Sequence, residues 1–349
     1  MRIMQVMAGA EHGGAETAFV DMCLALKEAG VVQHIVTRAN DLRVPQLRAA
    51  GLQVDCLPFG GAIDVYTPWK MKSLIAAFKP QIVQTWMARA AWKTPANPQE
   101  YCKVSRLGGY YKLKYFKTTD DFTTITPDIR EYLIKEGVAP DRVRHINNFA
   151  ETEPVAKPVT KRELDTPDTA IAVLALGRLH HAKALDVLIR AIEDVPNVHL
   201  WIAGEGDLRQ ELADVAYDAG VNTRVHFLGW RADRAALLQT CDICVFPSRY
   251  EPFGTVFVQA WANHTPVICS RADGPRQFVR DGEDGLLFDI DDVAGLTAAL
   301  RKLIADKALQ EKLVAAGFAR YEAEFTKEKT VQAYLDFYSE ILARAGLAA

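Results

Sequence analysis

Short apolar runs alternate with segments of helical periodicity along this 349-residue chain, and this alternation constrains the fold more than any other feature. In the first half, runs that predict strands lie at 3–8, 33–38, 53–59, 81–86, 122–126 and 142–146. A second series lies at 170–176, 199–203, 225–228, 243–247, 266–270 and 286–288. Helical patterns separate several of these runs, notably at 15–29, 69–78 and 127–136. Strands alternating with helices predict an α/β fold with two parallel sheets of similar size.

A segment without apolar periodicity separates the two series. Residues 151–168 are rich in proline, threonine and charge, which is typical of a linker. We therefore expect one domain at 1–160 and a second at 161–326. The segment 327–349 has apolar residues at helical spacing and is predicted to pack back onto the first domain. Ligands bind beyond the carboxyl ends of parallel strands, so two such domains facing each other predict a central cleft.

Composition excludes several classes of protein. A net charge of −3 provides no general attraction to nucleic acid, and no run of about 18 apolar residues is present to span a membrane. The six cysteines are scattered, mostly in apolar segments, which predicts reduced thiols packed in the core of a cytoplasmic protein. Cys241 and Cys244 form a Cys-x-x-Cys motif, but no second Cys or His pair lies nearby to favour a zinc site.

The segment 246–260, Phe-Pro-Ser-Arg-Tyr-Glu-Pro-Phe-Gly-Thr-Val-Phe-Val-Gln-Ala, predicts an anion and sugar site. It joins a buried strand to a helix through a Pro-Phe-Gly turn. The first backbone N–H groups of such a helix lack partners and attract a diphosphate. Glu251 lies just before the turn, and its carboxylate is suited to accept hydrogen bonds from sugar hydroxyls.

Three further motifs follow predicted strands of the second half. Arg178 follows Gly177, and Lys183 lies five residues later, so both cations can converge on a phosphate. Gly204 and Gly229 end the next two strands, where small residues let a ligand approach the backbone. Surface charges and plain turns are the alternative interpretations. The Gly204 segment is not a dinucleotide fingerprint, because no third glycine follows at the required spacing.

In this order the motifs resemble the carboxyl half of glycosyltransferase family 4. The resemblance covers nearly the whole chain, including Gly13-Gly-Ala-Glu after the first strand and Ile146-Asn-Asn before the linker. It implies a retaining enzyme of the GT-B fold, with two facing Rossmann-like domains, that transfers a hexosyl or related group from a nucleoside-diphosphate sugar. The implied catalytic residues are Arg178 and Lys183 at the diphosphate and Glu251 at the sugar. The implied donor-binding residues are Gly13, Gly14, Gly204, Gly229, Phe253, Gly254, Thr255 and Gln259.

The chain departs from the family pattern at two places. The family has a second glutamate eight residues after the first, where it binds the ribose, and here that residue is Gln259. Loss of the charge weakens such a bond by about 1 kcal/mol. Relatives also carry a histidine near the donor sugar, in a loop that this chain fills with residues 104–109 and no histidine. Arg106, a backbone carbonyl or His12 are the candidate substitutes.

A metal ion is not required by this interpretation. Asp289 and Asp291 match an Asp-x-Asp motif, but they precede a predicted helix and are expected to cap it. Arg178, Lys183 and helix N-termini can carry the diphosphate charge instead, so we predict no metal and no cofactor. The pair His180-His181 has two interpretations, a loop beside the phosphates and a pair of metal ligands, and the loop is favoured.

The segment 101–117 of the first domain contains five basic and five aromatic residues and no acid. Aromatic rings stack on sugars and cations bind phosphates, so Lys112 and Lys114 are candidate contacts for a phosphorylated glycolipid. The same mixture suits an anionic membrane surface, and the alternative is a solvated basic loop with core aromatics. We therefore expect an enzyme at the inner face of the membrane that extends a lipid-linked saccharide, such as a lipopolysaccharide core or a polysaccharide precursor.

Three other functions remain open at this stage. Gln259 and the missing histidine suit a nucleotide-sugar-binding protein with weak or no turnover. A sugar phosphorylase or an epimerase could use the same fold, because a fold does not determine the reaction. A dinucleotide-dependent oxidoreductase is disfavoured, since it would need a glycine fingerprint and an acidic residue about 20 positions further on. The base and sugar of the donor are not specified by these residues.

Overall fold

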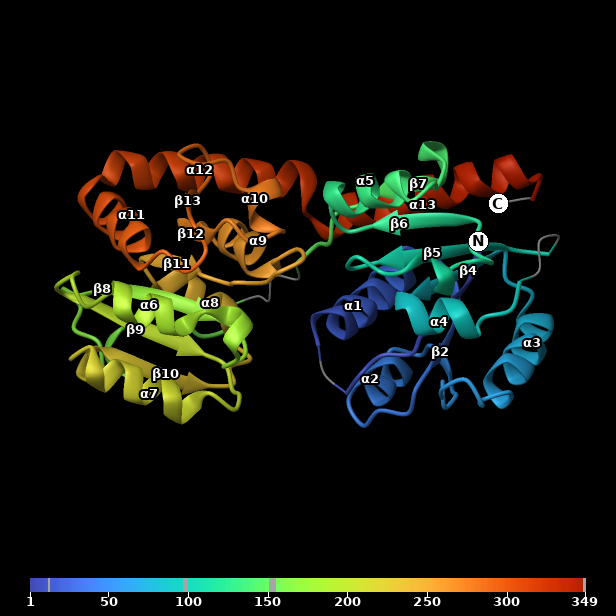
Figure 1. Cartoon of the computed structure of the whole chain (residues 1–349), viewed down its shortest axis with the longest axis horizontal. Coiled ribbons are helices and arrows are strands. Elements are labelled where there is room, and N and C mark those ends of the chain that lie inside the picture. Colours follow the sequence, from blue (N-terminus) through green and yellow to red (C-terminus); the bar gives the residue numbers. More distant parts are fainter. Residues whose placement is uncertain (12, 97–99, 151–154, 348–349) are drawn as a thin grey trace. The chain divides into compact units, whose positions relative to one another are not determined.

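The computed structural model of this protein describes residues 1–11, 13–96, 100–150 and 155–347. The chain forms two compact units, one containing residues 1–148 and 327–349 and the other containing residues 149–326 (Figure 1). The chain therefore passes from the first unit to the second between residues 148 and 149, whereas the sequence predicted this boundary between residues 160 and 161. No helix among the described residues is long and apolar enough to cross a membrane.

The first unit is built on a parallel sheet with the strand order β3-β2-β1-β4-β5-β6-β7. Strands β1, β4 and β5 lie at its centre and are almost entirely buried, as strands covered by helices on both faces must be. The strands are β1 (Arg2–Met7), β2 (Val32–Thr37), β3 (Gln53–Cys56), β4 (Ile82–Trp86), β5 (Cys102–Leu107), β6 (Asp121–Thr124) and β7 (Val143–His145).

Helices connect these strands, and the last helix of the chain joins them. They are α1 (Gly14–Glu28), α2 (Arg43–Ala49), α3 (Tyr66–Phe78), α4 (Met87–Lys93), α5 (Pro127–Lys135) and α13 (Lys327–Ala345), with 3-10 turns η1 (Leu113–Tyr115) and η2 (Pro140–Arg142). Helix α13 buries one face against α1 and β5, and the Tyr338 hydroxyl donates to Gln84 Oε1 at 3.0 Å. The end of the chain thus completes the first unit.

Strand β5 corrects the expectation of a loop at 104–109. Its six residues are all buried, including Lys103 and Arg106. The Lys103 ammonium donates to Ala91 O and Thr94 O at 2.6 and 2.8 Å, while burial lowers its pKa to about 8. Because β5 contains the charged residues Lys103 and Arg106, the apolar pattern of the sequence does not predict it as a strand. The exposed basic and aromatic residues begin only after β5.

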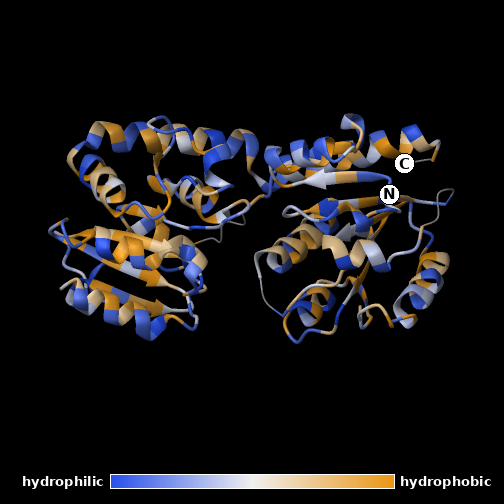
Figure 2. Cartoon of the chain, viewed as in Figure 1, coloured by the Kyte–Doolittle hydropathy of each residue, from blue (hydrophilic) through white to orange (hydrophobic). Residues whose placement is uncertain are grey.

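The second unit has a parallel sheet of the same pattern, in the order β10-β9-β8-β11-β12-β13. Counted within each unit, both orders begin 3-2-1-4-5-6, which is the Rossmann arrangement. Its strands are β8 (Ile171–Leu176), β9 (Val198–Ala203), β10 (Val225–Gly229), β11 (Ile243–Phe246), β12 (Val267–Ser270) and β13 (Leu286–Phe288). Figure 2 shows hydrophobic residues concentrated on the strands of both sheets. The prediction of two wound α/β domains is confirmed.

The helices of the second unit pack around this sheet. They are α6 (Leu185–Ala191), α7 (Arg209–Asp218), α8 (Arg234–Thr240), α9 (Thr255–Ala262), α10 (Pro275–Phe278), α11 (Val293–Ala305) and α12 (Lys307–Glu324), with 3-10 turns η3 (Arg162–Leu164), η4 (His181–Lys183) and η5 (Asn222–Arg224). The rings of Phe253, Phe257, Trp261, Phe278 and Phe325 form one buried cluster beside α9. The turn that precedes α9 is therefore anchored in the core through Phe253.

We predict that Phe325→Ala destabilises the second unit by about 4 kcal/mol, because it opens a cavity among these rings. Urea denaturation measures the loss, and amide hydrogen exchange of α9 should accelerate. Tyr217→Ala is the control, since this α7 residue is 73% exposed and its loss should change stability by less than about 0.5 kcal/mol. Equal effects of the two substitutions would contradict the anchoring role of the cluster.

Candidate active site

Lys183 and Glu251 lie 68 residues apart in the sequence and meet in the second unit. Lys183 ends η4, which follows β8, and Glu251 follows β11, the neighbour of β8 in the sheet. The ammonium Nζ lies 2.5 Å from the carboxylate Oε2, and both side chains are about one-fifth exposed. Nζ also lies 5.3 Å from the centre of the Phe246 ring. A cation for phosphate and a carboxylate for hydroxyls are thus adjacent at the carboxyl edge of the sheet.

Arg249 fastens the two segments that carry this pair. Its guanidinium donates to both carboxylate oxygens of Asp186 at 2.9 and 2.6 Å and to Asp291 Oδ1 at 2.6 Å. It also donates to the carbonyl of His181 at 2.9 Å, and the Arg249 backbone N–H donates to the carbonyl of Ala182 at 2.9 Å. The hydrogen bonds to Asp186 raise the pKa of Arg249, which stays charged. Arg249 is therefore a positioning residue for the turn that bears Lys183.

Sequence reasoning missed Arg249. Its main partner, Asp186, lies 63 residues earlier, and nothing in a single sequence pairs them. Asp291 is engaged in this interaction and Asp289 lies 3.3 Å from Arg271, so the expectation that these two aspartates cap a helix was wrong. The cap of α11 is Asp292, which accepts from the Gly295 N–H at 2.9 Å.

Glycines let the backbone of neighbouring strand ends approach closely. A Cβ atom on Gly204, after β9, would lie 1.9 Å from the carbonyl oxygen of Gly177, after β8. The Gly204 N–H in turn donates to the carbonyl of Gly229 at 2.8 Å. The ends of β8, β9 and β10 are thus drawn together, and Gly204 accepts no larger residue. Arg178 is exposed at the first of these ends.

Within the part of the chain that the structure describes, the turn before α9 leaves the start of this helix without a side-chain cap. Gly254 has a left-handed φ of 95°, and a Cβ there would lie 2.7 Å from the Phe246 ring. No side chain of the described residues caps the helix, and its first turn contains no acid. The N–H groups that begin at Thr255 therefore retain their positive field for an anion. Gln259 lies one turn further along α9 and is half-buried.

Gly274 packs against the backbone of the turn before α9, a contact that the sequence did not predict. Its N–H donates to the carbonyl of Glu251 at 2.8 Å. A Cβ on Gly274 would lie 2.0 Å from the carbonyl oxygen of Phe253. Only a glycine at position 274 therefore lets the backbone from Glu251 to Gly254 pack this closely.

The predicted residues of the first unit occupy different surroundings. Gly13 and Gly14 begin α1, and the Glu16 carboxylate folds back to accept from the Ala10 N–H at 2.7 Å. His12 lies outside the described residues. Arg106 is 2% exposed, donates to Asn148 Oδ1 at 2.6 Å and lies 4.2 Å above the Trp86 ring. These contacts make Arg106 part of the packing of this unit.

Lys112 and Lys114 are exposed around η1, and Lys114 Nζ lies 5.0 Å from the Tyr115 ring. Of the other basic residues in the segment 101–117, Lys117 is also exposed, whereas Lys103 and Arg106 are buried in β5. The predicted acceptor segment is thus half buried strand and half exposed loop. Its exposed cations all follow β5.

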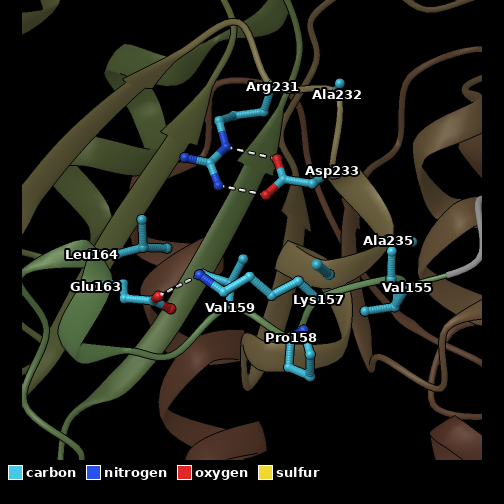
Figure 3. Close-up of a pocket in the computed structure, with 12 residues that line it drawn as sticks. Val155, Lys157, Pro158, Val159, Glu163, Leu164, Arg231, Ala232, Asp233 and Ala235 are labelled. Atoms are coloured by element: carbon cyan, nitrogen blue, oxygen red, sulfur yellow. Dashed lines mark hydrogen bonds and ion pairs between the residues drawn. The ribbon is translucent and has the colours of Figure 1, made fainter.

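A cavity of about 520 Å³ lies elsewhere in the second unit (Figure 3). Residues 155–159, 163–164, 231–233 and 235–236 line it. Two ion pairs border it, Lys157 with Glu163 and Arg231 with Asp233. Neither Lys183 nor Glu251 lines this cavity. Among the residues that the structure describes, no group of three or more His, Cys, Asp or Glu could hold a metal ion.

Two Rossmann-like units, with paired charges and glycine turns at the carboxyl edge of the second, define the GT-B class of glycosyltransferases. Family models agree: "Glycosyl transferases group 1" matches residues 156–320 and "Glycosyltransferase Family 4" matches residues 12–154. Two lipopolysaccharide core biosynthesis glycosyltransferases of Rhizobium meliloti (strain 1021) are similar along their length. LpsE is 36% identical over 93% of this chain and 95% of its own, and LpsD is 33% identical over 99% and 100%.

Solved structures show the same fold. Anabaena Alr3699/HepE in complex with UDP and glucose has a TM-score of 0.82 at 20% identity, covering 97% of this chain and 100% of its own. The lipopolysaccharide outer core galactosyltransferase WaaB, in its apo form, has a TM-score of 0.76 at 16% identity, covering 98% and 100%. This chain belongs to glycosyltransferase family 4 and is a glycosyltransferase.

We predict that Arg249→Lys lowers transferase turnover roughly tenfold, because one ammonium cannot join two carboxylates and a carbonyl as the guanidinium does. Release of nucleoside diphosphate measures turnover, and hydrogen exchange at residues 180–184 should accelerate. Arg271→Lys is the matched control, since Arg271 also pairs with two aspartates but bonds neither η4 nor the turn before α9. Unchanged turnover and exchange in Arg249→Lys would contradict the positioning role.

Proposed function

We propose that this chain is a retaining glycosyltransferase that moves a sugar from a nucleoside-diphosphate sugar to a lipid-linked saccharide of the lipopolysaccharide core type. The contact between Lys183 and Glu251 is the observation that carries the proposal. A diphosphate and its sugar are adjacent parts of one ligand, and here a cation and a carboxylate are adjacent in one site. The similarity to LpsE and LpsD supports the class of acceptor.

Stabilising the leaving group is the main catalytic task. When the bond to the sugar breaks, negative charge grows on the diphosphate while the sugar acquires oxocarbenium character. Lys183, the exposed Arg178 and the free N–H groups of α9 can all face that charge. With two cations and a helix terminus available, the proposed mechanism requires no divalent metal and no cofactor.

Glu251 holds the sugar in this mechanism. Its carboxylate accepts from the sugar hydroxyls, and Gly274 fixes its backbone. The leaving phosphate takes the proton of the attacking acceptor hydroxyl on the same face of the sugar, so no side-chain base is needed and the anomeric configuration is retained. Gly13 and Gly14 are proposed to bring the backbone of the first unit close to phosphates and acceptor.

The proposed acceptor explains the charges of the first unit. Lys112 and Lys114 are exposed and would meet the phosphates of a glycolipid. Such an acceptor is held in a bilayer, so the enzyme is proposed to work in the cytoplasm at the inner face of the membrane. A peripheral contact with anionic lipid would bring the two together.

We predict that Lys183→Ala and Glu251→Gln each lower kcat/KM about 10²- to 10³-fold, because each removes a group that acts on the charge or the sugar of the transition state. Turnover of the nucleoside-diphosphate sugar with a core glycolipid acceptor measures the loss. The anomeric configuration of the product, read by NMR, tests retention.

Asp281→Asn is the control for these variants, because Asp281 pairs with Arg271 at the surface and touches no site residue. Thermal shift can be measured with a panel of nucleoside diphosphates, and the nucleotide with the preferred base should raise the Tm of the wild type most. Stabilisation by nucleotide without any transfer, in wild type as in variants, would favour a nucleotide-sugar-binding protein and reject the enzyme mechanism.

Gln259→Glu should tighten binding of the nucleoside diphosphate about fivefold, since a carboxylate in place of the amide makes a charge-assisted bond to the ribose hydroxyls. Calorimetric titration of wild type and variant with the same nucleotide measures the change. Gln310→Glu, on the separate helix α12, adds the same charge elsewhere and should leave the affinity unchanged. Weaker binding in Gln259→Glu would show that residue 259 does not face the ribose.

A further inference from the structure

The loop between β3 and α3 holds apolar side chains in solvent. Ile63 is 93% exposed and Val65 79% exposed, and in the first turn of α3 Trp69 is 66% exposed. Tyr66 lies beside Trp69, with 5.9 Å between ring centres, and is also exposed. Single exposed apolar residues are ordinary on protein surfaces, but four within seven positions form a patch that indicates an interaction site.

Hydrogen bonds to Asp64 fix the conformation of this loop. The Asp64 carboxylate accepts from the Gly60 N–H at 2.7 Å and from the N–H and hydroxyl of Thr67 at 2.9 and 2.6 Å. Although burial opposes it, these bonds from Thr67 and Gly60 hold the pKa of Asp64 below its usual range. Asp64 thus points inward, and its neighbours Ile63 and Val65 are left facing solvent.

A second pair of exposed rings adjoins the loop. The buried Lys93 ammonium donates to the Asp64 carbonyl at 2.6 Å and lies 4.6 Å from the Trp92 ring. Trp92 in turn contacts Tyr115, with ring centres 6.3 Å apart. The patch therefore continues from the β3–α3 loop across α4 to η1. We name it the apolar face, made of Ile63, Val65, Tyr66, Trp69, Trp92 and Tyr115.

Basic residues accompany the apolar face. The sequence from 65 to 99 contains no acid and five cations, and the sequence from 108 to 119 contains no acid and three lysines. Exposed lysines lie close to the rings, with Lys72 one turn beyond Trp69 and Lys112 and Lys114 around Tyr115. The one acid within the patch, Asp64, pairs with the buried Lys93, whose Nζ lies 4.0 Å from its carboxylate and offsets its charge.

We propose that the apolar face docks this enzyme on a bilayer of anionic phospholipid. Tryptophan and tyrosine rings favour the headgroup level, aliphatic side chains favour the acyl boundary, and lysines favour anionic headgroups. A saccharide platform would use the rings, but it gives no role to Ile63 and Val65, the two most exposed members, which have no ring to stack on a sugar. The proposal deepens the proposed function, because it names the surface through which a lipid-linked acceptor is reached.

Flotation with vesicles tests the docking without any sugar donor or acceptor. The wild-type protein should float with vesicles of phosphatidylcholine and phosphatidylglycerol, but not with phosphatidylcholine alone, and less so at high salt. The variant Ile63→Ser/Val65→Ser/Trp69→Ser should lose affinity by roughly tenfold or more, as removal of inserted apolar groups requires. Lys112→Ser/Lys114→Ser should bind more weakly and with a flatter dependence on salt.

Matched controls exclude a loss of folding. Leu42→Ser and Tyr217→Ser remove other exposed apolar side chains, which lie outside the apolar face, and these variants should bind vesicles as the wild type does. The single variant Ile63→Ser, at the most exposed position, gives an independent measurement if the triple variant unfolds. Circular dichroism and nucleotide-induced thermal shift should match the wild type in each variant.

Other results would overturn the proposal. Failure of the wild type to float with anionic vesicles would do so, as would a triple variant that floats like the wild type. If that variant instead loses binding of a lipid-free acceptor saccharide, the face is a sugar platform. Vesicle binding in a protein without transferase activity would retain the docking surface and reject the proposed reaction, so the two failures are distinguishable.

Discussion

The active-site arrangement depends on one interaction, the set of hydrogen bonds from the Arg249 guanidinium to Asp186, Asp291 and the backbone of η4. The loops after the neighbouring strands β8 and β11 carry Lys183 and Glu251, respectively. Without a connection between them, each loop could move independently. A charged fork that bonds several acceptors at once fixes both loops with little loss of freedom per bond. The contact of 2.5 Å between Lys183 and Glu251 is the result.

The core of the second unit supplies the other constraint. Phe253 is buried among aromatic rings, while the carboxylate of Glu251, two residues earlier, contacts Lys183. The same short turn therefore belongs to the core and to the site. Close backbone packing at Gly204 and Gly274 adds to this rigidity, because the atoms that meet there leave no room for a side chain. The chemistry proposed for this edge of the sheet needs such preorganisation.

Much of the fold was predictable, because twelve apolar runs with helical spacing between them specify parallel α/β sheets. Strand β5 was not, since Lys103 and Arg106 disguise a buried strand whose charges are satisfied by partners far away in the sequence. In the site, Lys183 and Glu251 could be predicted from their strand ends. Arg249 and Gly274 could not, because their roles arise from contacts that only the folded chain creates.

The return of α13 to the first unit has a consequence for synthesis of the chain. Residues 149–326 form the whole second unit, so its sequence leaves the ribosome before the helix Lys327–Ala345 exists. Until then the first unit lacks two partners that α13 supplies: Tyr338, which donates to Gln84, and Tyr334, whose hydroxyl bonds Arg106. The part of the protein made first is thus the last to be completed, and a nascent chain stalled near its end carries an open hydrophobic face.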